Sequence, residues 1–191
     1  LLMSGNILGN IKNMYSEIME FEEVPGAAHH VPLDKPKEII DIIKDNFKLF
    51  GFLEIETPAL EKNSTLLGKY GNEGDRLVFK ILNSGDKVKK ADVNSLKQNN
   101  LSAFTDSISE KGLRYDLTVP LARFVAQHQN ELVFPFKRYQ IQNVWRADRP
   151  QHGRFQEFTQ CDADVIGPKS IIQEIELIKL YDSVFSQLGF N

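Results

Sequence analysis

The sequence has a single cysteine, Cys161, so no disulfide bond can form within the chain. One cysteine fits a reducing compartment. No apolar run approaches the roughly 20 residues that a membrane-spanning helix requires. The first ten residues, LLMSGNILGN, have neither the basic start nor the small-residue cleavage site of a secretory signal. We therefore expect a cytoplasmic protein that does not act at a membrane.

The chain also has no excess of positive charge, since 23 Lys+Arg stand against 26 Asp+Glu and the net charge is −3. Any contact with RNA must therefore come from local basic patches. A Walker-type phosphate loop and a zinc-type cysteine cluster are both missing from the sequence. His29 and His30 are adjacent in a proline-rich connector without further ligands nearby, so we interpret them as polar surface and predict no metal site.

With 191 residues, 41% of them hydrophobic, and a mean hydropathy of −0.32, the chain can bury the core of one globular domain, with or without an appendage. Apolar residues at helical spacing predict a helix over residues 6–23. A proline-rich connector over 25–37 follows. A second helix is predicted over 38–50, ended by Gly51, because glycine enters the left-handed region at little cost. A strand is predicted over 52–56.

The middle of the chain indicates short strands over residues 76–82 and 114–117, separated by a polar surface excursion over 83–112. A helix is expected to begin near Pro120. A long amphipathic helix over 170–188 is expected to turn its apolar residues inward, among them Ile171, Ile175 and Ile178. Strands in the middle with helices at both ends predict the α+β class with a largely antiparallel sheet.

The stretch 136–167 carries most of the information on function, because it reads as a strand, a basic turn and a second strand. Arg146, Arg149 and Arg154 gather in the turn, and arginine forks onto phosphate oxygens and stacks on flat rings. Side chains of one parity on a strand share a face. On the second strand one face is expected to line an open cleft and carries Phe158, Gln160, Asp162 and Asp164.

This combination of cations, an aromatic ring, an amide and carboxylates suits a nucleotide beside a small zwitterion. Asp162 is left without an assignment, because support of the strand end is the stronger interpretation of this residue. Cys161 has the opposite parity, which is the pattern of a core residue, so we interpret it as a small buried hydrophobe and not as a nucleophile.

Three segments resemble a known family. Residues 146–164, RADRPQHGRFQEFTQCDAD, closely resemble the second signature motif of class II aminoacyl-tRNA synthetases in its histidyl version. GFLEIETPALE, residues 51–61, resembles the first class II motif, and RYDLTVPLARFVAQ, residues 114–127, resembles a histidyl-specific substrate segment. The resemblance covers about residues 34–190, and the motifs stand in the family's order.

This resemblance implies a histidine–tRNA ligase, which activates histidine with ATP and transfers it to tRNA(His). ATP with Mg²⁺ would be a co-substrate, and no permanently bound cofactor is implied. Residues 34–191 would form the N-terminal part of a class II catalytic domain, while residues 1–33 are a segment and connector of unknown role. The third class II motif and the anticodon-binding domain are absent, so we expect a fragment that is inactive alone. The first motif forms a homodimer interface in the family.

The resemblance also assigns residues to ATP. Arg146 matches the arginine that contacts the α-phosphate, and Arg154 matches a position that reaches the outer phosphates. Phe158 matches the aromatic residue that stacks on adenine. Asp148 stands where the family has an acidic residue near the adenine side of the loop.

Histidine is assigned to a second set of residues. Asp116 and Thr118 are two apart on an expected strand, so they would face the same way, and with Gln160 they match the positions that bind the α-ammonium group. Asp164 matches the acidic position that faces the imidazole ring. A carboxylate there would be left unpaired by a substrate without a ring N–H, which gives discrimination.

Two alternatives remain open. Histidyl-synthetase paralogues exist that regulate histidine biosynthesis or sense uncharged tRNA, and they keep the fold while losing parts of the site. The chain could also be a nucleotide-binding α+β domain of another reaction. A third class II motif and an anticodon-binding domain further along the protein would favour the enzyme over the paralogue.

Overall fold

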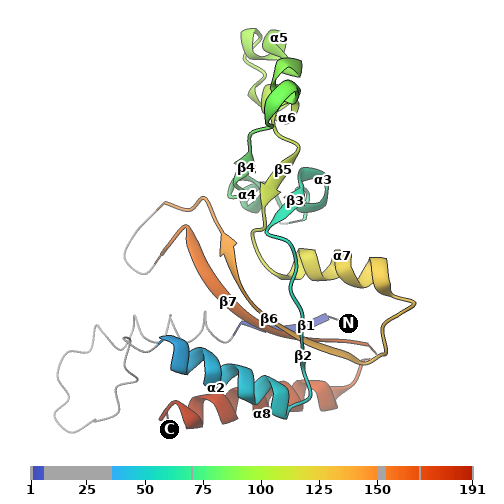
Figure 1. Cartoon of the computed structure of the whole chain (residues 1–191), viewed down its shortest axis with the longest axis vertical. Helices are drawn as coiled ribbons and strands as arrows, with labels where there is room; N and C mark the ends of the chain where they lie inside the picture. Colours follow the sequence, from blue (N-terminus) through green and yellow to red (C-terminus); the bar gives the residue numbers. More distant parts are fainter. Residues whose placement is uncertain (1, 7–35, 70, 150–153, 168, 191) are drawn as a thin grey trace, which may run out of the picture. The chain divides into compact units, whose positions relative to one another are not determined.

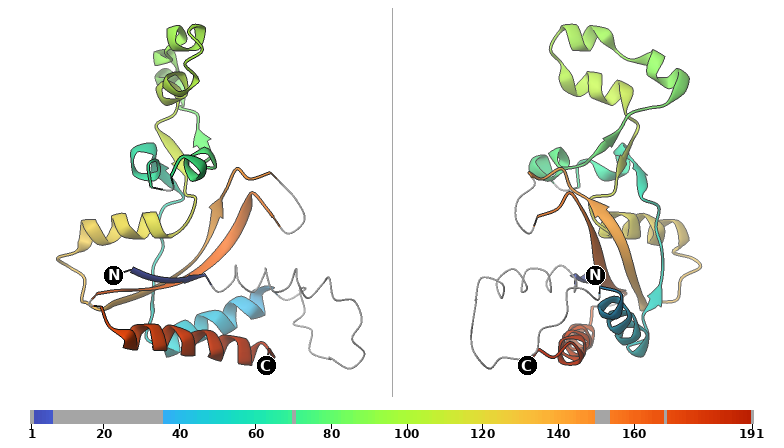
Figure 2. Two further views of the ribbon diagram at one scale, coloured as in Figure 1. Left: turned by 180° about the vertical axis from the view of Figure 1, so that it is seen from behind. Right: turned by 60° about the vertical axis from the view of Figure 1, so that its left-hand side comes forward.

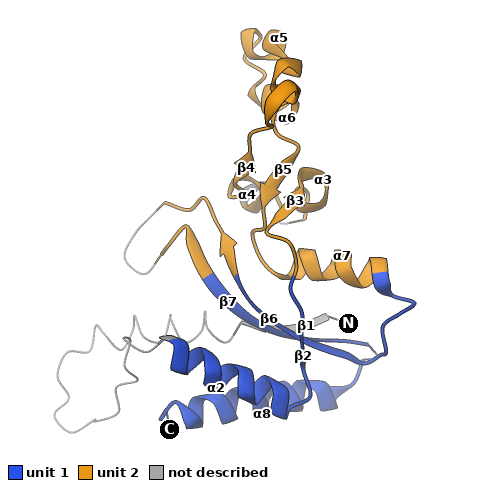
Figure 3. Ribbon diagram, viewed as in Figure 1, with its two compact units in different colours: residues 1–56, 128–142, 159–191 blue, residues 57–127, 143–158 orange. Residues whose placement is uncertain are grey.

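A computed structural model describes residues 2–6, 36–69, 71–149, 154–167 and 169–190. The helix expected over residues 6–23 lies outside this part, except for Asn6, which ends a strand. His29 and His30 also lie outside it. The chain forms two compact units, unit 1 with residues 1–56, 128–142 and 159–191, and unit 2 with residues 57–127 and 143–158 (Figure 3).

Unit 1 contains most of a four-stranded sheet in the order β1-β7-β6-β2 (Figure 1). The two long strands are β6, Phe136–Trp145, and β7, Glu157–Ile166, as expected from the strand–turn–strand pattern. β1, Leu2–Asn6, pairs antiparallel with β7. The short strand β2, Leu53–Glu54, pairs parallel with β6.

Two helices of unit 1, α2 (Pro36–Leu49) and α8 (Ile171–Gln187), pack on one face of this sheet (Figures 1 and 2). The α2 helix is followed by Gly51 at a φ of +76°, which confirms the expected glycine stop. The Ser183 hydroxyl on α8 donates to Asn46 Oδ1 on α2 over 2.6 Å. The core between helices and sheet consists of apolar side chains from α2, β6, β7 and α8, together with one residue just before β2 and one just after α8: Ile39, Ile43, Phe47, Phe52, Tyr139, Cys161, Ala163, Val165, Leu180, Val184 and Leu188.

The expected orientation of α8 is wrong in its first half. Ile171, Ile175 and Ile178 are 69%, 47% and 67% exposed, whereas Leu180 and Val184 are fully buried. The helix carries apolar residues on more than one face, and periodicity alone cannot select the face that meets the sheet.

Unit 2 contains a three-stranded antiparallel sheet in the order β3-β5-β4. Its strands are β3 (Leu60–Lys62), β4 (Lys80–Ile81) and β5 (Lys111–Leu113). The strands expected over 76–82 and 114–117 are therefore shorter and shifted. The helices of this unit are α3 (Asn63–Leu66), α4 (Gly71–Arg76), the 3₁₀ helix η1 (Gly85–Lys90), α5 (Val93–Lys97), α6 (Leu101–Ile108) and α7 (Thr118–His128).

The excursion over residues 83–112 is largely helical. Asp92 accepts hydrogen bonds from the backbone of Asn94 and Ser95 at the start of α5. Asn100 accepts one from Ala103 at the start of α6. Side chains of this kind satisfy the free N–H groups of a helix start, and the polar composition alone did not reveal them.

Candidate functional site

Arg146 directly follows β6, at the base of the hairpin between β6 and β7. Its backbone N–H donates to the Gln156 carbonyl over 2.9 Å, which closes the base of the loop. Its Nε donates to the Tyr115 carbonyl over 3.2 Å. Its guanidinium carbon lies 4.4 Å from the centre of the Tyr115 ring and 5.1 Å from that of Phe158. Arg146 is thus held by two rings and a carbonyl.

The remaining donors of Arg146 suit an anion. Within the described residues its two Nη groups donate no hydrogen bond, so four N–H bonds are available to phosphate oxygens. The rings fix the plane of the guanidinium at little cost to these donors, because cation–π contacts use its face and not its edge. Tyr115 was missed by sequence reasoning, although it lies inside the histidyl-like segment 114–127.

Phe158 is half-buried at the start of β7, between the exposed Glu157 and the half-buried Thr159. Its ring lies against the guanidinium group of Arg146, and the side chain is only half-buried, which is not the pattern of a core phenylalanine. The ring is therefore partly accessible, as an adenine platform requires.

Asp148 and Arg154 face each other across the loop. Arg154 Nη1 lies 3.9 Å from Asp148 Oδ1, and the Arg154 side chain is 63% exposed. The Gln156 amide donates to the Asp148 carbonyl over 3.1 Å. A pair this long and exposed contributes little stability, so Arg154 can exchange its partner for a phosphate at small cost.

Asp116 and Thr118 are not on a strand, which corrects the expectation that strand parity makes them face the same way. β5 ends at Leu113, and Thr118 is the first residue of α7. Asp116 Oδ1 accepts from the Val119 N–H over 3.1 Å, so this carboxylate helps to cap α7. Both side chains are half-buried at the helix start, where a carboxylate is favoured by the helix dipole.

Gln160, Asp162 and Asp164 share one face of β7, as expected, but this face is buried and not the open cleft predicted from parity. The three side chains are 6%, 3% and 0% exposed. Cys161, on the opposite parity, is fully buried in the core, which confirms its expected burial. In the described part of the chain, Gln160 Oε1 is buried without a hydrogen-bond partner. A buried acceptor of this kind costs free energy unless a donor binds it.

Asp164 forms an ion pair with Arg138 of β6, from Arg138 Nη2 to Asp164 Oδ2, and both side chains are fully buried. No role for Arg138 was predicted from the sequence. A signal existed, since a charged residue beside Tyr139 in the middle of a long strand is unusual. The same face carries Gln140, whose amide donates to Gln142 over 2.8 Å.

Two tyrosines of unit 1 have raised pKa values. Burial, with the nearby carboxylates of Asp162 and Asp164, raises the pKa of Tyr181 to about 12. Burial, with the hydrogen bond that its hydroxyl donates to Glu54 over 2.9 Å, raises the pKa of Tyr139 to about 12 as well. Both phenols therefore remain neutral over the whole physiological range.

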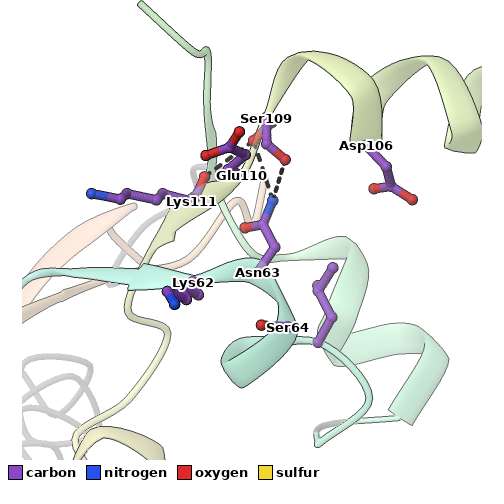
Figure 4. A pocket seen from close by; sticks show the side chains of 8 residues that line it. Lys62, Asn63, Ser64, Asp106, Ser109, Glu110 and Lys111 are labelled. Carbon is purple, nitrogen blue, oxygen red and sulfur yellow. Dashed lines mark hydrogen bonds between the residues drawn. The ribbon is translucent and has the colours of Figure 1, made fainter. Parts of the chain in front are cut away.

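A cavity of about 490 Å³ lies in unit 2 (Figure 4). Two lysines and two carboxylates balance each other in its wall, and the Asn63 amide donates to the Ser109 carbonyl there over 2.8 Å. It contains none of the predicted site residues. Its lining is Lys62, Asn63, Ser64, Leu67, Asp106, Ser109, Glu110 and Lys111. Among the described residues, no cluster of three or more His, Cys, Asp or Glu could hold a metal ion.

A sequence model described as histidyl-tRNA synthetase matches residues 86–191, which is more than half of the chain. The chain belongs to this family. A curated member, the histidine–tRNA ligase of Christiangramia forsetii, is 64% identical over 157 residues, covering 82% of this chain and 34% of the relative. The chain thus spans about a third of the length of the curated histidyl-tRNA synthetases that it matches.

Solved structures agree with the family. A histidyl-tRNA synthetase from Nostoc sp. PCC 7120 has a TM-score of 0.60 and 27% identity, covering 79% of this chain and 30% of that one. A Bacillus halodurans protein described as an ATP phosphoribosyltransferase regulatory subunit/histidyl-tRNA synthetase has a TM-score of 0.61 and 26% identity, covering 81% and 34%. The fold is that of a class II synthetase catalytic domain, as the motifs predicted. No helix in the described residues is long and apolar enough to cross a membrane.

Proposed function

We propose that this chain carries part of the catalytic site of a histidine–tRNA ligase, and that the whole protein joins histidine to tRNA(His). Family membership supports the reaction class. The observation that carries the proposal is the arrangement around Arg146. Its Nη groups donate to no described residue, and its guanidinium group lies against Tyr115 and a partly accessible Phe158 ring, which fits a nucleotide phosphate beside a base. Residues 34–191 would then be the N-terminal part of the catalytic domain.

In the first step the carboxylate of histidine attacks the α-phosphorus of ATP, brought as its Mg²⁺ complex, and pyrophosphate leaves with its bonding electrons. In the second step a hydroxyl of the terminal adenosine of tRNA attacks the histidyl carbonyl, and AMP leaves. Neither step needs a covalent enzyme intermediate, so the protein contributes position and charge stabilisation. Arg146 would stabilise the charge on the equatorial oxygens of the α-phosphate.

The other residues of the hairpin complete the proposed ATP site. Arg154 would exchange its long contact with Asp148 for the outer phosphates. Phe158 would stack on adenine, and Asp148 would lie on the adenine side of the loop. A stacking platform and a forked cation together select a nucleotide over a free phosphate.

Two sets of polar side chains are assigned to histidine. The buried Oε1 of Gln160, which has no hydrogen-bond partner among the described residues, supports a role in accepting from the α-ammonium group. Asp116 and Thr118 are assigned to the same group by the family's motif, and Asp164 to a ring N–H. The two sets lie in separately described units, so their joint assignment rests on the motif alone.

A homodimer through the first-motif region is part of the proposal. Leu49 and Leu53, at the end of α2 and the start of β2, are 75% and 62% exposed. Large apolar side chains exposed close together in sequence are typical of an interaction surface. They would be covered by a second copy of the chain.

Contact with tRNA would come from local basic groups, because the chain as a whole is acidic.

The test is ATP–pyrophosphate exchange by the full-length protein with each of the twenty amino acids in turn. We expect exchange with histidine alone, followed by charging of tRNA(His). The Bacillus halodurans neighbour, whose description includes a regulatory subunit, keeps a second candidate in view, namely a non-catalytic regulatory paralogue. Histidine binding without exchange would favour that candidate, and exchange with another amino acid would exclude the proposed substrate.

A further inference from the structure

Arg138 and Asp164 form an ion pair on the polar face of the sheet in unit 1. Both side chains are fully buried, and the contact joins Arg138 Nη2 to Asp164 Oδ2. Tyr139, the next residue on β6, packs in the apolar core together with Cys161 and Val165 of β7. Because parity alternates along a strand, Arg138 and Asp164 therefore lie on the opposite face from that core.

A pair of this kind is an inefficient way to stabilise a fold. Taking two charges out of water costs much of what their attraction returns, and an apolar pair of similar volume is often at least as stable. The other face of the same sheet is packed with apolar residues such as Tyr139, Ala163 and Val165, without a buried ion pair among the described residues of that core. The pair therefore indicates a purpose beyond packing.

In the proposed function, the Asp164 carboxylate accepts a hydrogen bond from the imidazole ring of histidine. A carboxylate offers about four acceptor positions on its two oxygens, so one that bonds a guanidinium can also accept from a second donor. Discrimination by such a group depends on its orientation, because a hydrogen bond weakens steeply when it is bent or lengthened. A short aspartate side chain has few rotamers, and a forked guanidinium can select one of them.

We propose that Arg138 is a positioning residue for histidine recognition, which holds the Asp164 carboxylate in the orientation that accepts an imidazole N–H. This inference rests on the proposed function and adds to it a residue that does not touch ATP. Arg138 acts on histidine only through Asp164. Its loss should therefore affect histidine selection and leave the handling of ATP intact.

The experiment is steady-state ATP–pyrophosphate exchange on the full-length protein, with histidine and ATP varied in turn. For Arg138→Met we expect the histidine KM to rise about tenfold or more, the scale on which a hydrogen bond to a charged group is lost, with the ATP KM little changed. Asp164→Asn should show the same split. The double variant R138M/D164N should be no worse than D164N alone, because both changes remove one function.

Three further measurements separate positioning from folding. Lys137→Met is the matched control, because Lys137 is the next residue on β6, its ammonium group pairs with Glu176 of α8, and it has no place in the site. It should leave both KM values unchanged. Arg138→Lys keeps the positive charge without the forked donors, so it tests the proposal even if the methionine variant fails to fold. It should give an intermediate histidine KM. Discrimination between histidine and 3-(2-thienyl)alanine, a ring isostere without an N–H, should fall in Arg138→Met and not in Lys137→Met.

A folded Arg138 variant whose histidine and ATP KM values are both unchanged, or both raised equally, would overturn the proposal and leave Arg138 a structural residue. The proposed function fails differently, by absence of histidine-dependent exchange in the unmodified protein. In that event the positioning role is tested by the rise in Tm that histidine causes. A rise in the unmodified protein that Arg138→Met abolishes and Arg138→Lys reduces supports the positioning role even without catalysis. A rise that neither variant changes overturns the positioning role, and no rise in the unmodified protein overturns both proposals.

Discussion

The guanidinium carbon of Arg146 lies 5.1 Å from the centre of the Phe158 ring. Two residues with separate predicted roles, one toward phosphate and one toward adenine, are therefore in direct contact. A cation on one face of a ring leaves the other face for a base, and it stiffens both side chains. Substitution of either residue should consequently disturb the other, so the two should not behave as independent contributors to ATP binding.

Arg146→Ala in the full-length protein should reduce histidine-dependent exchange by a factor on the order of 10²–10³, the usual effect of removing one electrostatic contact to a transition state. Lysine should rescue poorly, because it lacks the fork and the planar face. The fold should persist, since the backbone bond to Gln156 does not involve the side chain. Arg149→Ala, an exposed arginine of the same loop, is the control for lost charge. Exchange by Arg146→Ala within a few-fold of the unmodified protein would remove this residue from the mechanism.

Phe158→Ala should raise the ATP KM more than the histidine KM, by about 1–3 kcal/mol in binding free energy, which is the value of stacking one base on an aromatic side chain. Phe158→Tyr should have a small effect, because the ring remains. The double variant with Arg146→Ala should lose less than the sum of the two single losses. Phe155→Ala is the matched control, since that ring is 62% exposed and has no predicted role. An early loss of thermal stability with a normal ATP KM would instead make Phe158 a packing residue.

Sequence patterns predicted the elements whose signals are local. The helix before Gly51, the two long strands around the basic turn and the long C-terminal helix all depend on periodicity and turn chemistry within about 20 residues. The core position of Cys161 followed from parity alone. The family followed from three motifs in order, which is a stronger signal than any single one.

The wrong predictions involve what packs against an element. Parity correctly grouped Gln160 with Asp164, but it could not say whether that face is open, and it is buried. Asp116 and Thr118 looked like strand neighbours, yet the carboxylate caps the helix that begins at Thr118. Arg138 was missed because its partner lies 26 positions away on another strand, and strand pairing beyond the hairpin turn is not visible in a single sequence.

Gln160→Met should separate stability from function. The substitution removes a buried oxygen that has no partner in the described residues, so it should leave the free energy of unfolding unchanged or raise it by about 1 kcal/mol. The same change should raise the histidine KM, because the proposed acceptor of the ammonium group is lost. Denaturant unfolding and exchange kinetics on one preparation measure both effects. A clear loss of stability would mean that Gln160 already has a structural partner, so that its oxygen is not available to the ammonium group.

Gly112→Ala should destabilise unit 2, because strand β5 is crowded at this point. A Cβ at position 112 would lie 2.9 Å from the Phe79 carbonyl oxygen, 3.1 Å from Asn63 Oδ1 and 3.1 Å from Val78 Cγ1. The Phe79 oxygen is backbone and accepts from the Leu113 N–H over 2.9 Å, so it cannot yield freely. We expect a cost of about 1–3 kcal/mol, the range for overpacking, seen as a lower Tm.

The control for this position is Lys111→Ala, on the exposed neighbour in the same strand, which should change stability by no more than about 0.5 kcal/mol. An unchanged Tm in Gly112→Ala would show that β3 and β4 can move apart at β5. Equal losses in both variants would assign the effect to strand propensity instead of crowding.

The two raised tyrosine pKa values predict how the fold responds to alkali. Tyr139 and Tyr181 have pKa values of about 12 in the folded protein, against an ordinary value of 10.0. Because the folded pKa is the higher one, the neutral phenol is favoured by folding. The resulting stability is fully present below pH 10 and is lost as the pH rises through 12.

Phenylalanine variants separate the two residues. Tyr181 donates no hydrogen bond to another described residue, so Tyr181→Phe should keep its stability at neutral pH and unfold at higher pH than the unmodified protein, since phenylalanine cannot ionise. Tyr139→Phe loses the bond to Glu54 and should cost about 1–3 kcal/mol at neutral pH. The measurements are tyrosinate absorbance, in which each variant should lose one late-titrating phenol, and circular dichroism against pH. Ordinary titration of both tyrosines near pH 10 in the folded protein would contradict the burial of their hydroxyl groups.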